Sequence, residues 1–214
     1  DVDVLSASEY DNKIAWYEND GNSNFGEQQV ITSYTTDAYS IYAADLDNDG
    51  DNDVLSASGW DDKIAWYEND GSGNFGIQQI VTTDALGATD VYAADLDNDG
   101  DIDVLSASTE DDKIAWYEND GSGSFGTQQS ITTADDGAIS VYAADLDNDG
   151  DMDVLSTSGV DDKIAWYEND GSGNFGDQQV IAININSVIY ATDLDNDGDI
   201  DVLSASGVDD KIAW

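Results

Sequence analysis

The chain has 214 residues, of which 48 are acidic and 5 are basic, and its formal net charge is −43 at pH 7. Nucleic acids and anionic membranes both attract Lys and Arg, so this balance argues against either as a partner. The chain has no Cys and no His, which excludes disulfides, thiolate and imidazole metal sites and histidine-based catalytic triads. Hydrophobic residues make up 40% of the sequence, which predicts a packed core, and no apolar run is long enough to span a membrane.

The sequence repeats one unit. The motif "DVLSAS" or a near copy starts at Asp3, Asp53, Asp103, Asp153 and Asp201, at spacings of 50, 50, 50 and 48 residues. Repeats of this length indicate an array of supersecondary units. Only two stretches vary between units, namely the residues before each "DDK" and the segment between "QQ" and "YAADL".

Each complete unit is predicted to contain four short strands, rich in Val, Ile, Tyr or Trp and separated by Gly, Asn and Asp. In the third complete unit these are Ser140–Leu146, Asp153–Ser158, Lys163–Asn169 and Gln178–Ala182. No stretch has helical periodicity. Four short strands in about 50 residues predict an all-β fold, a β-propeller built from four-stranded blades.

The predicted organisation is a single repeat array over residues 1–214. It comprises a partial blade at 1–33, blades at about 40–83, 90–133 and 140–182, and a partial blade at 188–214. Since both outer units lack a strand, we expect the sequence to be a fragment of a longer protein. Self-association through the incomplete outer blades is a further possibility, because unpaired strand edges recruit partners.

The acidic loop "DLDNDGDND" places carboxylates at its positions 1, 3, 5, 7 and 9 and Gly50 at position 6. Calcium takes 6–8 oxygen ligands in a flexible cage. Asp45, Asp47 and Asp49 are predicted to supply carboxylates, Asp51 its main-chain carbonyl with its side chain left free, and Asp53 to close the site. The loop differs from an EF-hand, which has Glu at position 12. A solvated acidic turn or a surface adapted to salt is the alternative, but four intact copies favour calcium.

The run "DLDNDGDxDVLSAS", followed by "FG" in the later hairpin, resembles the FG-GAP/VCBS-type repeat over essentially the whole chain. Integrin-type and fungal-lectin-type propellers share this loop. The resemblance implies a calcium-stabilised propeller, usually of seven blades, on an extracellular or cell-surface protein with a binding or adhesion role. This chain has too few strands for seven blades. The calcium ligands that the resemblance implies at the four sites are Asp45, Asp47, Asp49, Asp51 and Asp53; Asp95, Asp97, Asp99, Asp101 and Asp103; Asp145, Asp147, Asp149, Asp151 and Asp153; and Asp193, Asp195, Asp197, Asp199 and Asp201.

Three other features recur or stand out. One Trp per unit is predicted to fill the gap between adjacent blades rather than to stack on sugars, whereas Trp60 lies in a variable stretch and is the candidate for an exposed ligand contact. The single Lys of each unit is predicted to be an ion-pair anchor between neighbouring strands or blades. Glu68 and Asp70 could form a glycosidase pair, but their many copies favour turn chemistry. The recurring residues are Trp16, Trp66, Trp116, Trp166 and Trp214, and Lys13, Lys63, Lys113, Lys163 and Lys211.

These observations predict a non-enzymatic, secreted or surface-attached module. Calcium orders each blade, and variable loops recognise carbohydrate or a surface protein. One alternative is a structural subunit that joins head to tail into extracellular filaments. The other is a non-catalytic appendage of a secreted enzyme.

Overall fold

The computed structural model describes residues 2–183, 187–206 and 211–214, and in this part of the chain every regular element is a β-strand. The prediction of an all-β fold is therefore confirmed. The short runs rich in β-branched and aromatic residues form the strands, and clusters of Asp, Asn and Gly form the connections between them.

The strands form five separate antiparallel sheets, and in each sheet the strand order follows the chain. The first and fifth sheets have three strands each, and the three sheets between them have four. The first sheet contains β1 (Val4–Ser8), β2 (Lys13–Tyr17) and β3 (Gln29–Thr32), and the second contains β4 (Ala38–Ala44), β5 (Asp53–Ser58), β6 (Lys63–Tyr67) and β7 (Gln79–Thr82). The third contains β8 (Ala88–Ala94), β9 (Asp103–Ser108), β10 (Lys113–Tyr117) and β11 (Gln129–Thr132). The fourth contains β12 (Ala138–Ala144), β13 (Asp153–Ser158), β14 (Lys163–Tyr167) and β15 (Gln179–Ile183), and the fifth contains β16 (Ser187–Thr192), β17 (Asp201–Ser206) and β18 (Lys211–Ala213).

Of the four strands predicted for the third complete unit, three have different ends in the structure. β13 has the predicted bounds, but β12 begins and ends two residues earlier than Ser140–Leu146. It ends at Ala144 because the next amides are held by the acidic loop: the Leu146 amide donates to the Asp153 carboxylate at 3.1 Å. β14 ends at Tyr167, two residues before the isolated bridge between Asn169 and Phe175, and β15 is shifted by one residue.

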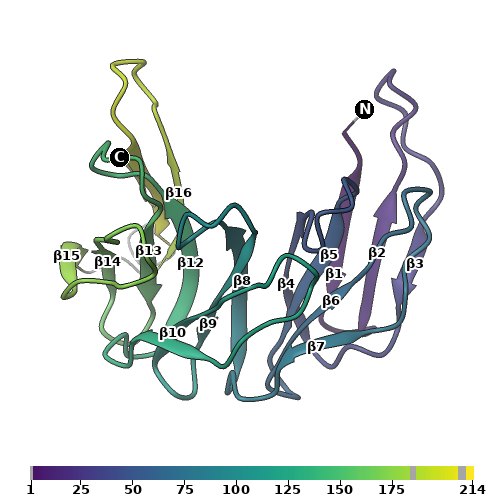
Figure 1. The fold of residues 1–214 in the computed structure, drawn as a ribbon, viewed down its shortest axis with the longest axis horizontal. Helices are drawn as coiled ribbons and strands as arrows, with labels where there is room; N and C mark the ends of the chain where they lie inside the picture. Colours follow the sequence, from purple (N-terminus) through teal and green to yellow (C-terminus); the bar gives the residue numbers. More distant parts are fainter. Residues whose placement is uncertain (1, 184–186, 207–210) are drawn as a thin grey trace.

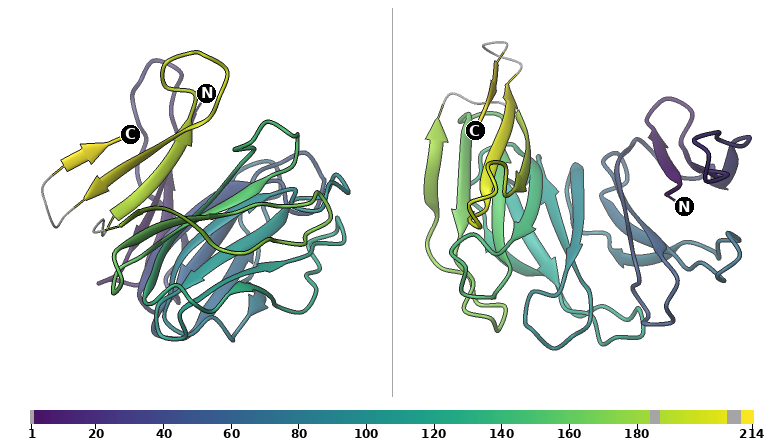
Figure 2. Two further views of the ribbon diagram at one scale, coloured as in Figure 1. Left: turned by 90° about the vertical axis from the view of Figure 1, so that its left-hand side faces the viewer. Right: turned by 90° about the horizontal axis from the view of Figure 1, so that it is seen from above.

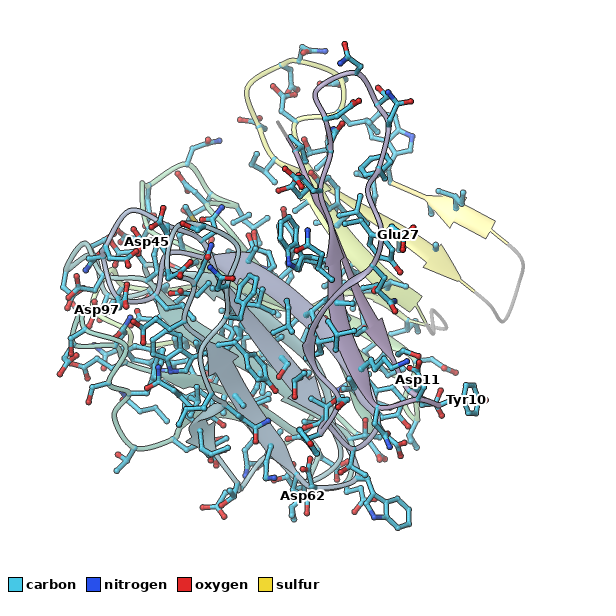
Figure 3. All side chains as sticks on the ribbon, turned by 90° about the vertical axis from the view of Figure 1, so that its right-hand side faces the viewer. Tyr10, Asp11, Glu27, Asp45, Asp62 and Asp97 are labelled. Atoms are coloured by element: carbon cyan, nitrogen blue, oxygen red, sulfur yellow. The ribbon has the colours of Figure 1, made fainter. Side chains whose placement is uncertain are left out.

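The register places the acidic loops at one end of the strands. Ala44 pairs with Asp53, so residues 45–52 join β4 to β5, and Ser58 pairs with Lys63, so residues 59–62 form the turn at the opposite end of β5. Figure 3 shows this separation, with Asp45 and Asp97 together at one end and Asp62 at the other. The same arrangement recurs in the third and fourth sheets.

The sheets stand side by side in an arc that is not closed (Figures 1 and 2). The first strands of the second to fifth sheets, β4, β8, β12 and β16, contact one another in order along the arc. One tyrosine from each of β4, β8, β12 and β16 forms a continuous row of tilted or edge-on ring contacts, with ring centroids 4.5, 4.6 and 5.4 Å apart along Tyr42, Tyr92, Tyr142 and Tyr190. This arrangement is propeller-like, with each sheet as a blade.

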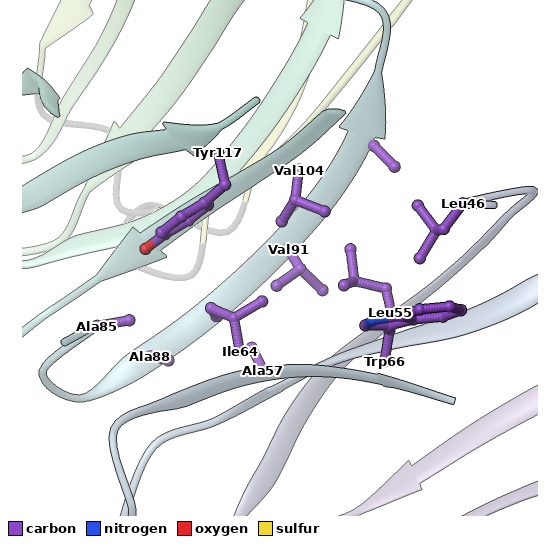
Figure 4. Packing of buried hydrophobic residues seen from close by; sticks show 11 residues of the cluster. Leu46, Leu55, Ala57, Ile64, Trp66, Ala85, Ala88, Val91, Val104 and Tyr117 are labelled. Atoms are coloured by element: carbon purple, nitrogen blue, oxygen red, sulfur yellow. The ribbon is translucent and has the colours of Figure 1, made fainter. Parts of the chain in front are cut away.

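The hydrophobic core consists of layers between adjacent blades (Figure 4). Trp66 is only 2% exposed and lies in the same cluster as Val104 and Tyr117 of the next blade. Burial of one such side chain contributes on the order of 1.5–3 kcal/mol. The prediction that the recurring Trp fills the gap between blades is confirmed for Trp66 and Trp116, whereas Trp214 is 71% exposed.

The recurring lysines make ion pairs, but mainly within their own hairpin. Lys63 lies 2.7 Å from Asp61, two residues earlier, and Lys13, Lys113 and Lys163 repeat this pairing. The predicted ion pair between neighbouring strands or blades is therefore wrong for most copies. The turn of the hairpin instead places the Asp two residues before each Lys within ion-pair distance. Lys163 also approaches Asp135, at 4.0 Å, in the connection before β12. The side chain of Lys211 lies outside the described part of the structure.

Candidate metal sites in the acidic loops

Main-chain amides of the acidic loop hold its own carboxylates in place. The Asp45 carboxylate accepts hydrogen bonds from the amides of Asp49, at 3.2 Å, and Gly50, at 3.0 Å. Asp49 accepts from the Asp51 amide at 2.9 Å. Gly50 has φ of +95°, a conformation that side chains rarely adopt, and this explains glycine at position 6. The loop is thus folded around its acidic groups by local bonds.

The aspartate at position 9 joins the loop to the rest of its blade. Asp53 is fully buried and accepts from the Leu46 amide at 3.0 Å and the Asn69 amide at 2.9 Å. Burial raises the pKa of Asp53 to about 6, although these two bonds lower it and the nearby Asp47 carboxylate raises it further. Burial likewise raises the pKa of Asp103 to about 7 and that of Asp153 to about 6. A cation beside these groups would favour their ionised forms.

In the described part of the chain, four acidic clusters form, one in each acidic loop. In each cluster three carboxylate oxygens lie within 4.8 Å of one another. The first cluster joins loop positions 1, 3 and 9, and the other three join positions 1, 3 and 5. The members are Asp45, Asp47 and Asp53; Asp95, Asp97 and Asp99; Asp145, Asp147 and Asp149; and Asp193, Asp195 and Asp197.

The donor set fits a calcium ion. Oxygens that each lie 2.3–2.6 Å from one ion are at most about 5 Å apart, which matches the 4.8 Å limit of the clusters. In the second cluster, Asp95 Oδ1 is buried and has no hydrogen-bond partner among the described residues. A buried carboxylate oxygen without a partner is costly, and a bound cation would satisfy it. The clusters could therefore hold a hard divalent cation.

In the second, third and fourth acidic loops, the side chain at position 7 accepts a hydrogen bond from the preceding loop. The prediction of a free side chain was made for Asp51 in the first loop, and these bonds do not contradict it. Asp101 accepts a hydrogen bond at 2.7 Å from Asn48, which lies at position 4 of the preceding loop. Asn98 and Asn148 donate in the same way to Asp151, at 2.6 Å, and Asp199, at 2.8 Å. Each acidic loop is therefore bonded to the next one along the arc.

A second asparagine strengthens this contact between blades. Asn119 is 1% exposed, and its Nδ2 donates to the carbonyls of Leu46 in the preceding blade and Ile102 in its own, both at 2.8 Å. Asn169 repeats the pattern with Leu96 and Met152. The sequence places Asn169 at the end of a predicted strand, and neither asparagine was predicted to make a contact between blades. Their recurrence at one place in every unit was the available signal for a further role.

The other candidates lie away from the clusters. Trp60 is in the turn after β5 and is 77% exposed, as predicted for a loop tip. Asp70 accepts from the Ser72 amide and from Asn74 in the hairpin that follows β6, so its assignment to turn chemistry is confirmed. The hydrogen bond from the Asn74 side chain is the main cause that lowers the pKa of Asp70.

The sequence was compared with known families. The FG-GAP-like repeat matches at residues 1–56, 45–106, 95–156 and 148–204. The chain belongs to the FG-GAP-like repeat family. Each of the four matches ends within or just after a "DVLSAS" strand, so the acidic loops lie inside the family pattern.

Solved structures share the fold of this FG-GAP-like chain. A lectin from Agrocybe aegerita that recognises non-reducing terminal N-acetylglucosamine superposes with a TM-score of 0.60 at 21% identity, over 81% of this chain and 47% of the lectin. The NanB sialidase of Streptococcus pneumoniae gives 0.59 at 16% identity, over 91% and 32%. The V. cholerae biofilm matrix protein Bap1 gives 0.53 at 20% identity, over 95% and 34%. This chain thus spans from about a third to half of each of these proteins.

The search of curated protein sequences found no match. Within the described residues, no helix has the length and apolar character needed to cross a membrane.

Proposed function

We propose that this chain is a calcium-stabilised, non-catalytic carbohydrate-binding module that works outside the cell. The observation that carries the proposal is the recurrence of one acidic cluster at the same corner of four successive blades. A shared fold with a lectin and with sialidases supports carbohydrate as the ligand class.

The exposure of the clusters supports an extracellular setting. In the third and fourth clusters, two of the three aspartates are exposed, and waters would complete the coordination of any bound ion. Open oxygen sites of this kind bind calcium with dissociation constants of about 10⁻⁴–10⁻³ M in extracellular modules. Such sites are filled only where free calcium reaches the millimolar range.

A non-catalytic role is supported by the repetition of the candidate acid pair. An active site is usually one asymmetric place, whereas the Glu68 and Asp70 pair recurs in near-identical copies along the chain. The Asp70 carboxylate also accepts hydrogen bonds from the Ser72 amide and from Asn74, which hold it in the hairpin turn.

The proposal is tested by isothermal titration of the calcium-free protein with calcium, followed by a glycan array with and without calcium. We expect about four weak calcium sites and glycan binding that is lost in chelator. Titration without calcium uptake would refute the metal role, and an array without hits in calcium would refute the carbohydrate role.

A further inference from the structure

A pocket of about 450 Å³ lies between the second and third blades, at the end of the strands opposite the acidic loops. Its described walls come from the connection before β4, the turn after β5, the connection before β8 and the turn after β9. We call it the turn-end pocket. This volume is typical of small-molecule sites, which lie in the range of about 300–1,000 Å³.

Two glycines and two hydrogen bonds form the floor of the pocket. A Cβ at Gly59 would lie 2.6 Å from Cε2 of Tyr39, and a Cβ at Gly87 would lie 2.7 Å from Cγ of Glu110. The glycines therefore let the ring and the acidic side chain lie directly on the main chain. Asp62 accepts from the Gly87 amide at 2.9 Å, and the Gly59 amide donates to the Asp37 carbonyl at 3.0 Å. These bonds fix the two connections relative to each other.

The pocket differs from its counterparts in the other repeats. The residue at the turn tip is Tyr10 in the first unit, Trp60 in the second, Glu110 in the third and Val160 in the fourth. Only the junction of the second and third blades therefore has Trp on one side and Glu on the other. In an array of near-identical units, this is an asymmetric place, as expected of a binding site.

The lining combines aromatic faces with carboxylates. Trp60 is 77% exposed and Tyr39 is 50% exposed, so both rings offer apolar faces to a ligand. Asp37, Asp62 and Glu110 supply carboxylates that accept hydrogen bonds from hydroxyl or amine groups. A pyranose ring has this pairing of properties, with C–H groups on its faces and hydroxyls around its edge.

The negative charge of the turn-end pocket disfavours acidic saccharides. Of the described residues that line it, three are acidic and none is basic. The nearby Lys63 is already paired with Asp61 at 2.7 Å. A sialylated or sulfated sugar would bring like charge against these carboxylates, which costs binding energy.

We infer that the turn-end pocket binds a non-acidic saccharide, neutral or amine-bearing, which stacks on Trp60 and donates hydrogen bonds to Asp37, Asp62 and Glu110. This inference rests on the proposed carbohydrate-binding function and adds to it the place and the ligand class. The site is separate from the acidic loops, so calcium binding and sugar binding can be changed independently.

The test compares the intact chain with Trp60→Ala, Trp60→Phe and Glu110→Gln on a glycan array in calcium, followed by titration with the best hit. Val160→Ala is the matched control, because Val160 occupies the same turn tip two blades further along. We expect Trp60→Ala to weaken binding at least ten-fold, Trp60→Phe to retain part of the affinity, Glu110→Gln to weaken binding several-fold and Val160→Ala to have no effect. Calcium titration of every variant should match the intact chain.

Three outcomes would overturn the inference. If the intact chain binds a glycan and Trp60→Ala binds it equally well, the site is wrong although the proposed function stands. If only sialylated or sulfated glycans bind, the ligand class is wrong. If the intact chain binds no glycan, the proposed carbohydrate function fails, and this inference fails with it.

Discussion

Asp90 occupies a position where two neighbouring repeats have serine, and its carboxylate connects three blades. Ser40 donates to it at 2.6 Å from the preceding blade, and Ser140 at 2.7 Å and the Val141 amide at 3.0 Å donate from the following one. Burial raises the pKa of Asp90 above its ordinary value of 3.8, although these hydrogen bonds lower it. A single residue thus adds a pH-dependent contribution to the packing of the innermost strands.

We predict that Asp90→Ser makes stability less dependent on pH. Because the pKa of Asp90 is higher in the folded than in the unfolded state, the folded chain keeps a proton that the unfolded chain has lost. The free energy of unfolding should therefore fall as pH rises from about 4 through the raised pKa, and the variant should lack this contribution. Urea unfolding of the calcium-free chains across this range measures it. A constant difference between wild type and variant at every pH would contradict the prediction.

Asp47→Ala should remove one calcium site and leave the others. Asp47 belongs to the first acidic cluster, and its loss removes one of the three carboxylates that the cluster brings together, for an ion that needs at least six oxygen ligands. Titration should then find about three sites in place of four. Asp70→Ala is the control, since Asp70 serves the hairpin turn, and it should retain every site. Equal site counts for both variants would refute the assignment of the first cluster.

At the scale of elements, hydrogen bonds across the blade junctions accompany the apolar layers. Asn119 lies in the hairpin after β10, and its side chain reaches the carbonyls of two blades. Asn19 occupies the same position in the first blade, but it is half-buried, and among the described contacts its side chain donates only to Val2 of its own blade, in an exposed hydrogen bond. Variants of Asn19 and Asn119 can therefore distinguish the contribution of the hydrogen bond within a blade from that of the hydrogen bond between blades.

Asn119→Ala should destabilise the chain by about 2–4 kcal/mol, because it leaves the buried Leu46 carbonyl and the partly buried Ile102 carbonyl without this donor. Asn19→Ala should cost less than about 1 kcal/mol, since water replaces the lost bond at an exposed site. Chemical denaturation in calcium measures both values. Similar losses for the two variants would show that the bond between blades contributes little.

The strands could be predicted from the sequence, but the hydrogen bonds that join neighbouring blades could not. Strand identity followed from short Val, Ile and Tyr runs between turn residues, and β13 was placed correctly to the residue. The end of β12 was missed because it depends on Asp153, seven residues beyond Leu146, capturing the Leu146 amide. The contact from Asn48 to Asp101 joins residues 53 apart, so no local pattern indicates it. The clustering of Asp45 with Asp47 was predictable, because their spacing in one tight turn fixes it.

At the scale of the whole molecule, the dominant quantity is the net charge of −43. Four calcium ions would bring it to about −35 and would neutralise charge where it is densest. The row of tyrosines and the apolar layers, which include Leu46 and Leu96 of the loops, resist the remaining repulsion. Among the described residues, however, no Lys forms an ion pair with an acidic-loop carboxylate. The loops are therefore the part of the fold that depends most on cations.

A chelator should lower the melting temperature by about 12–24 °C. At calcium ten times above the dissociation constant, each site contributes about 1.4 kcal/mol, so four sites contribute about 6 kcal/mol, and each kcal/mol is worth about 2–4 °C in a chain of this size. Differential scanning calorimetry with calcium and with chelator measures the shift. Sodium chloride should restore only part of the loss, because screening weakens repulsion without supplying ligands. A melting curve unchanged by chelator would contradict a stabilising role for calcium.

The contacts between blades have one consequence for how such a gene can change. The asparagine contacts recur at the same separations, 53 for Asn48 and Asp101 and for Asn98 and Asp151, and 73 for Leu46 and Asn119 and for Leu96 and Asn169. Deletion or duplication of one whole 50-residue unit brings chemically equivalent partners into the same places, so the remaining junctions keep these asparagine bonds. Recombination between near-identical copies can thus lengthen or shorten the arc in whole steps without any compensating substitution.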